Sequence, residues 1–228
     1  MSTDLQRYVI FRAVTGSVAH GLSQPESDVD RRGFYLPPAR LHWSLDGVPE
    51  QIETAHEECY WEIGKFIRLA LKSNPNVLEC LYSPFVETCT PLAAELAARR
   101  HIFLSKLAYG TYNAYVDSQF RKIARDLGQQ RQPRWKHVVH LIRLLLSGIS
   151  VLRDGTVPVH VGEHRDRLLA IRGGGIPWEQ IDQWRLALHR EMEAAAVSAK
   201  LPDAPAVSEA NDYLLRARRF AAREDYEQ

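Results

Sequence analysis

Apolar and polar residues alternate in the first quarter of the chain in the way typical of short β-strands. Residues 8–15, YVIFRAVT, are rich in β-forming side chains and predict a strand that runs into a Gly-Ser pair. A second strand is predicted from Val29 through GFYL, and the proline pair at 37–38 ends it because proline cannot continue a strand ladder. The alternating stretch 51–61 leads from this region into a different pattern.

The spacing of apolar residues then becomes helical. Between residues 62 and 72 they fall three or four positions apart, which predicts a helix with one buried face. The sequence KSNPN at 72–76 ends that helix, because a residue before proline is biased away from the α region. From residue 91 onward the pattern is nearly all helical. The predicted helices cover 91–100, 105–127, 135–153, 177–199 and 206–223.

These patterns predict an α/β (α+β) protein in which a small sheet is followed by a C-terminal helical bundle that packs against it. We divide the chain into a core of residues 1–98 and a helical domain of residues 99–228. A chain of 228 residues, 45% hydrophobic and 25% charged, can bury a core as one compound domain or as two small ones.

Composition favours a cytoplasmic protein. The longest apolar runs, such as VVHLIRLLL, fall short of the ~20 residues that cross a membrane, and the first residues lack a basic-then-apolar leader. The cysteines at 59, 80 and 89 are odd in number and lack the spacing of metal ligands, which suits small buried thiols in a reducing compartment. We therefore expect neither a membrane segment nor a zinc site.

Charge is unevenly distributed although the net charge is only +1. Residues 99–172 carry 14 Lys and Arg against five Asp and Glu, a net charge of +9, while the segments on both sides are negative. Such a segment suits contact with a phosphate backbone or with triphosphates. Solvated helix faces spread round the molecule explain it equally well.

Candidate chemistry is concentrated in residues 16–38, GSVAHGLSQPESDVDRRGFYLPP. Side chains alternate along an extended strand, so Asp28 and Asp30 should share one face with their Cα atoms roughly 7 Å apart. Two such carboxylates can bind Mg²⁺, which proteins usually hold with one or two carboxylates, substrate phosphates and water. Gly16 would let the backbone approach a phosphate, and Ser17 would add a hydroxyl donor.

The order of strand, Gly-Ser pair and Asp-x-Asp strand resembles the nucleotidyltransferase core of the DNA polymerase beta superfamily. The motifs are more similar still to those of the predicted nucleotidyltransferase family associated with RNA-repair operons. Blocks at 16–38, 62–84 and 137–159 carry the resemblance, which covers most of the chain from about 14 to 182. It implies a mixed-sheet nucleotidyltransferase core and a helical domain that completes the cleft for nucleotide and acceptor.

The resemblance also implies a third carboxylate on the strand before the first long helix. By position Glu57 is our choice, although it departs from the aspartate expected there. Glu58, on the other face of the strand, competes directly, and Glu53 and Glu62 stay open. We therefore expect Mg²⁺ or Mn²⁺ to be bound by Asp28, Asp30 and Glu57.

Three further residues are assigned to nucleotide binding. Lys65 lies on the first predicted helix, where it could reach a triphosphate or be an ordinary solvated lysine. His140 and Arg143 lie three residues apart on the predicted helix at 135–153, so they share a face that is either nucleotide-facing or structural.

The function that the resemblance implies is metal-dependent transfer of a nucleoside monophosphate from a nucleoside triphosphate to an acceptor hydroxyl. An RNA 3′ end is the acceptor it implies, and nucleotidylation of a protein or a small molecule stays open. The alternative is a catalytically weakened nucleotide-binding regulatory module, similar to an antitoxin. The Leu- and Ala-rich helix faces at 184–201 suit a homo-oligomer and internal packing equally well.

Overall fold

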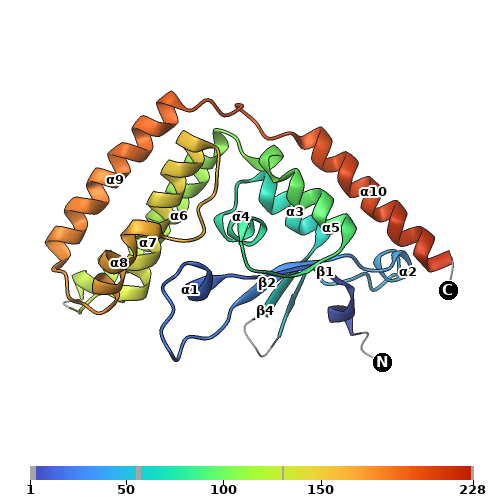
Figure 1. Cartoon of the computed structure of the whole chain (residues 1–228), viewed down its shortest axis with the longest axis horizontal. Helices are drawn as coiled ribbons and strands as arrows, with labels where there is room; N and C mark the ends of the chain where they lie inside the picture. The colour runs from blue at the N-terminus through green and yellow to red at the C-terminus, as the bar shows by residue number, and fades with distance from the viewer. Residues whose placement is uncertain (1–3, 55–57, 130, 227–228) are drawn as a thin grey trace.

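The computed structural model describes residues 4–54, 58–129 and 131–226, and their path is shown in Figure 1. Its described residues form a five-stranded mixed sheet followed by C-terminal helices, which confirms the predicted α/β class. The strand order is β3-β4-β2-β1-β5. The strands are β1 (Val9–Val14), β2 (Arg31–Tyr35), β3 (Gln51–Glu53), β4 (Glu58–Glu62) and β5 (Val86–Cys89).

Pairing in the sheet is antiparallel except between β2 and β4, which run parallel. Strand β1 lies between β2 and β5, and β2 passes very close to it. A Cβ atom on Gly33 of β2 would lie 1.9 Å from the carbonyl oxygen of Phe11, so only glycine fits this crossing. The Gly-Ser pair after β1 and the two aspartates before β2 are thereby brought to the same end of the sheet.

Three helices pack on one side of the sheet: α3 (Ile63–Leu71), α4 (Pro75–Tyr82) and α5 (Pro91–Ala98) (Figure 1). Three aromatic rings meet in the core between these helices and the sheet. The ring of Phe34 lies 5.3 Å from that of Phe11 and 4.4 Å from that of Phe66, measured between centroids, and all three side chains are buried. Such ring pairs add to the free energy gained from burial alone.

A second group of helices follows: α6 (Leu107–Gly128), α7 (Trp135–Asp154), α8 (Arg165–Arg172) and α9 (Trp178–Ser198). Helix α7 contacts each of the other three. By length and composition α7 could cross a membrane, yet 67% of its most apolar window is buried inside the protein. Its apolar character is therefore accounted for by its central place in the bundle.

The last helix, α10 (Val207–Tyr226), leaves the bundle and returns to the core, where it packs on α2 (Ala39–His42) and α3 (Figure 1). The Arg218 guanidinium lies 2.5 Å from the Glu62 carboxylate, and Glu62 also caps α3. The division of the chain at residue 98 stays a prediction. Helix α10 belongs to the predicted helical domain but packs on helices of the predicted core.

Strands β5 and β2 differ from the sequence prediction. Strand β5 was not predicted, because it is a four-residue edge strand whose side chains are mostly exposed and so lack a buried alternation. Strand β2 begins at Arg31 rather than at Val29, so Asp28 and Asp30 belong to the segment that leads into it. The carbonyl of Asp30 accepts a hydrogen bond from the Thr15 amide at 2.8 Å, next to the last residue pair of β1 and β2.

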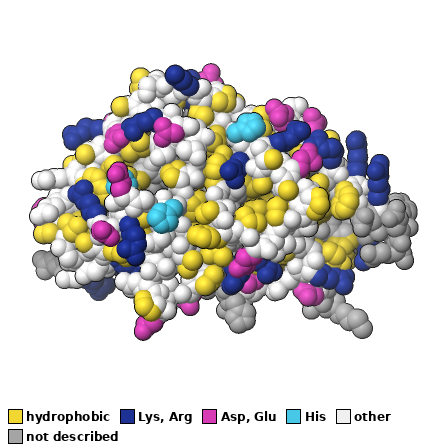
Figure 2. Space-filling view, in the orientation of Figure 1, with side chains coloured by type: hydrophobic (Ala, Val, Ile, Leu, Met, Phe, Trp, Pro, Cys, Tyr) yellow, Lys and Arg dark blue, Asp and Glu magenta, His cyan; other side chains and the backbone are white. Residues whose placement is uncertain are grey.

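Surface charge is mixed on the face drawn in Figure 2, where Lys and Arg side chains are interspersed with Asp and Glu. Some cations of the 99–172 segment form surface ion pairs, such as Arg153 with Glu191 at 2.5 Å. Others line a cavity between the bundle and the core: Lys122, Lys136 and Arg143.

Candidate active site

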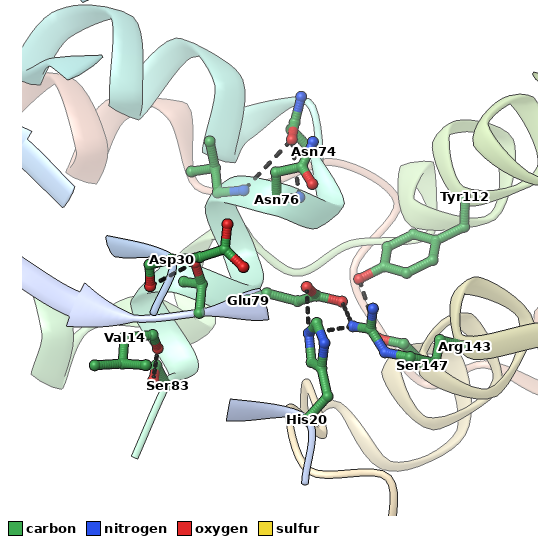
Figure 3. A network of polar contacts seen from close by, with 12 residues as sticks. Val14, His20, Asp30, Asn74, Asn76, Glu79, Ser83, Tyr112, Arg143 and Ser147 are labelled. Carbon is green, nitrogen blue, oxygen red and sulfur yellow. Dashed lines mark hydrogen bonds and ion pairs between the residues drawn. The ribbon is translucent and has the colours of Figure 1, made fainter. Parts of the chain in front are cut away.

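This cavity has a volume of about 660 Å³ and lies where the Gly-Ser end of the core meets α6, α7 and α8. Its core side is formed from residues within 15–32 and 76–79, and its helical side from residues within 119–143 and Arg172. Figure 3 shows four of the polar side chains that line it, His20, Asp30, Glu79 and Arg143. The predicted site residues that line it are Gly16, Ser17, Asp28, Asp30, His140 and Arg143.

Gly16 starts the single-turn helix α1 (Gly16–Ala19) with φ +65°, a left-handed conformation that favours glycine. A Cβ atom at this position would lie 1.8 Å from Oδ2 of Asp30. The missing side chain therefore makes room for the Asp30 carboxylate, which lies directly against the Gly-Ser turn. This role differs from the close approach to phosphate that the sequence suggested for Gly16.

Asp28 and Asp30 both face the cavity, while Val29 between them does not line it. The predicted alternation therefore holds even though both aspartates precede β2. Among the described residues neither carboxylate forms an ion pair. Two carboxylates that face one cavity, with no ion-pair partner among the described residues, are a donor set that fits Mg²⁺, and the hard oxygen ligands suit Mn²⁺ as well.

The third carboxylate is not identified by the described part of the chain. Glu57 lies outside it and stays a prediction. The alternatives Glu53, Glu58 and Glu62 do not line the cavity. Glu58 accepts a hydrogen bond from a tyrosine hydroxyl at 2.8 Å, and Glu62 is bound to Arg218. Within the described residues no group of three His, Cys, Asp or Glu side chains is placed to hold a metal ion.

A buried charge network joins the core to the bundle inside the cavity (Figure 3). The Arg143 guanidinium of α7 donates to the Glu79 carboxylate of α4 at 2.6 Å, and His20 Nε2 lies 3.1 Å from the same carboxylate. Arg143 also contacts His20. Burial alone would raise the pKa of Glu79, but the charge of Arg143 and the hydrogen bond from His20 outweigh it and lower the pKa to about 2. Glu79 is therefore ionised.

Glu79 and His20 were not predicted as site residues. Each stands within a block that carries the family resemblance, His20 after the Gly-Ser pair and Glu79 after the Asn-Pro-Asn turn. A carboxylate inside the apolar sequence VLECL was the available signal, since buried acids are rarely left unpaired.

His140 lines the cavity one helical turn before Arg143. Burial is the main cause that lowers its pKa, and the charge of Arg143 adds to it, so that the pKa falls from 6.5 to about 4. The imidazole is therefore neutral at pH 7 and can both donate and accept a hydrogen bond.

Lys65 does not line the cavity. Its ammonium lies 3.7 Å from the Glu50 carboxylate and 3.5 Å from the side-chain oxygen of Gln51, beside β3. The structure therefore separates Lys65 from the two aspartates. Cations that the sequence did not single out line the cavity instead: Arg32, Lys122, Lys136 and Arg172.

The segment after the Gly-Ser turn is held by the helical half of the chain. Arg165 donates to the carbonyl of Gly21 at 2.9 Å, and Arg172 donates to that of Leu22 at 2.8 Å. Gly21 has φ +71°, and a Cβ atom there would lie 2.2 Å from the imidazole of His160. These contacts fix the Gly-Ser turn relative to the bundle and so define the shape of the cavity.

Comparison with known proteins agrees with the resemblance seen in the sequence. The family described as "RNA repair pathway DNA polymerase beta family" matches residues 2–216. YcgL of Bacillus subtilis (strain 168), described as an uncharacterized protein, is 27% identical over 154 residues, which are 66% of this chain and 58% of YcgL. The chain thus spans less than two thirds of that relative.

Proposed function

We propose that this chain, which belongs to the RNA repair pathway DNA polymerase beta family, transfers a nucleoside monophosphate from a nucleoside triphosphate to an acceptor hydroxyl with Mg²⁺ or Mn²⁺. The observation that carries the proposal is that Asp28 and Asp30, which form no ion pair with any other described residue, face one cavity together with the Gly-Ser turn. The volume of the cavity, about 660 Å³, is within the range of small-molecule sites.

Each residue has a defined part in this reaction. Asp28 and Asp30 would hold the metal, with Glu57 as the proposed third ligand. A bound Mg²⁺ supplies charge neutralisation and lowers the pKa of an acceptor hydroxyl. Ser17 donates to a phosphate oxygen, and neutral His140 offers a hydrogen bond to the nucleotide. Because phosphoryl chemistry depends mostly on positioning and electrostatics, few further groups are required.

RNA with a free 3′ hydroxyl is the acceptor we propose. The support is the description of the family, which names RNA repair, and the net charge of +9 in residues 99–172. Small-molecule and protein hydroxyls are the competing acceptors.

The test is transfer of label. Purified protein is incubated with Mg²⁺ or Mn²⁺ and each α-labelled nucleoside triphosphate, with and without a mixed RNA pool. The control is the double variant Asp28→Ala, Asp30→Ala. Label that moves to RNA with the wild type alone supports the proposal, and label on protein or on a small molecule corrects the acceptor. No transfer by the wild type to any acceptor refutes nucleotidyl transfer.

A second candidate is a nucleotide-binding regulatory module with weakened chemistry. It is favoured by one observation: among the described residues no group of three His, Cys, Asp or Glu side chains is placed to hold a metal ion. Metal-dependent binding of a triphosphate without any transfer of label would select this candidate.

A further inference from the structure

We propose that Lys122 and Lys136 bind the β- and γ-phosphates of the triphosphate. This inference rests on the proposed function and goes beyond it, because it assigns the phosphate tail to the helical side of the cavity. Neither lysine was distinguished from the other cations by the sequence.

The cations that line the cavity differ in what already surrounds them. Arg143 is neutralised by Glu79 at 2.6 Å. The Arg172 guanidinium is directed to the carbonyl of Leu22 at 2.8 Å. In contrast, no described acid forms an ion pair with Lys122 or Lys136. These two ammonium groups are therefore free to meet an incoming anion.

The two lysines are carried by neighbouring helices that are tied together between them. Lys122 lies on α6, and Lys136 lies in the first turn of α7. Gln119 lies one turn before Lys122 on α6, and His137 follows Lys136 on α7. The side chains of Gln119 and His137 are hydrogen-bonded at 3.1 Å, and Gln119 is buried. Both lysines thus project from one braced wall of the cavity.

The charges of the two lysines affect the pKa of the neighbouring His137. Burial is the main cause that lowers the pKa of His137, and the charges of Lys122 and Lys136 lower it further. The charge of Arg134 adds to this shift, and that of Asp126 opposes it.

The opposite side of the cavity is acidic, since it is lined by Glu26, Asp28 and Asp30. The α-phosphate must lie at the aspartates, because the reacting bond is there. The β- and γ-phosphates carry most of the remaining charge, which a metal ion held by these acids would neutralise only in part. A pair of flexible ammonium groups on the facing wall supplies the compensating charge, as lysines commonly do for phosphates.

Magnesium tripolyphosphate is a suitable probe, because it carries the phosphate tail and needs no knowledge of the base. Its dissociation constant is measured by isothermal titration calorimetry for the wild type, Lys122→Ala, Lys136→Ala and the double variant. We expect affinity to fall about tenfold for each single variant and about 100-fold for the double, as for charge-assisted hydrogen bonds. Both side chains are exposed, so the fold should be unaffected.

Arg121→Ala is the matched control, because it removes a cation from the same helix at a position that does not line the cavity. Its affinity for tripolyphosphate should stay within about twofold of the wild type. Affinity for a nucleoside monophosphate should be unchanged in both lysine variants, which would locate their effect at the phosphate tail.

Two results would overturn the inference. One is unchanged affinity for tripolyphosphate in the double lysine variant. The other is weaker binding of an RNA oligonucleotide by that variant while tripolyphosphate binding is retained, which would assign the lysines to nucleic acid. The label-transfer assay keeps the two proposals separate. If the wild type transfers no label but its tripolyphosphate binding depends on the lysines, nucleotidyl transfer is refuted and this inference stands.

Discussion

Removing the Glu79 carboxylate should destabilise the protein far more than removing a surface acid. Glu79 and Arg143 each have a side chain only 10% exposed, and they lie 2.6 Å apart. The substitution Glu79→Ala would leave a guanidinium buried beside His20 without a compensating charge. Arg143→Ala would leave the carboxylate in the same situation, with only His20 as partner.

The structure gives the size of this effect in two ways. Breaking a buried ion pair by removing one partner costs about 3–5 kcal/mol. Separately, the pKa of Glu79 falls from 4.5 to about 2, which corresponds to about 3 kcal/mol of stability. The folded pKa is the lower one, so this stability is present above pH 4.5 and is lost as the pH falls toward 2. Both values are a large share of the ~5–15 kcal/mol typical of a folded domain.

Urea denaturation at pH 7, followed by tryptophan fluorescence, measures the loss for Glu79→Ala, Arg143→Ala and the double variant. The double variant should be less destabilised than the sum of the singles, because removing the second charge relieves the first. Glu191→Ala is the control: it breaks an ion pair with Arg153 whose side chains are 51% and 44% exposed, and it should cost at most about 1 kcal/mol. A loss below ~1 kcal/mol for Glu79→Ala, or strict additivity, would refute the reasoning.

Three further predictions concern the cavity. Gly16→Ala should lower label transfer about 100-fold, because its methyl group would displace the Asp30 carboxylate, and near-normal transfer would contradict this packing. Glu57→Gln should abolish transfer while Glu58→Gln retains it, since Glu58 does not line the cavity; the reverse outcome would make Glu58 the third ligand. Between pH 6.5 and pH 4 the wild type should lose stability as the pH falls, because the unfolded state takes up a proton at His140 first. Urea titrations at the two pH values measure this loss. The loss of stability should be smaller for His140→Asn than for the wild type, by about 3 kcal/mol at most, and an equal loss would contradict the lowered pKa.

Much of the fold could be predicted because its long helices have a strong period. The helix expected at 135–153 is found as Trp135–Asp154, and the last helix, expected at 206–223, as Val207–Tyr226. Strand β5 and helix α4 could not be predicted in this way. Helix α4 is buried nearly all round, so its apolar residues show no one-sided pattern, and its N-terminal sequence indicates the end of the preceding helix and a turn.

Some residues of the candidate site could be predicted from a local motif, and others could not. The Gly-Ser pair and the two aspartates are close in sequence and joined by one short segment, so a local motif was enough to bring them together. Lys122, Lys136 and Glu79 reach the cavity only through tertiary packing, which leaves no local pattern. Lys65 shows the converse, because a lysine near the motif in sequence faces β3 instead of the cavity.

Arg143 shows why a cation inside a cavity is not by itself a ligand group. From the sequence Arg143 is assigned to nucleotide binding, with a structural role left open. The structure places it in the cavity, where it contacts Glu79 and His20. A buried ion pair is a poor source of net stability, because well-packed apolar residues often do as well in its place. The role of this pair is to hold α7 of the bundle against α4 and against His20, which follows the Gly-Ser turn. The width of the cavity therefore depends on it, and an apolar replacement that restored stability should still fail to restore label transfer.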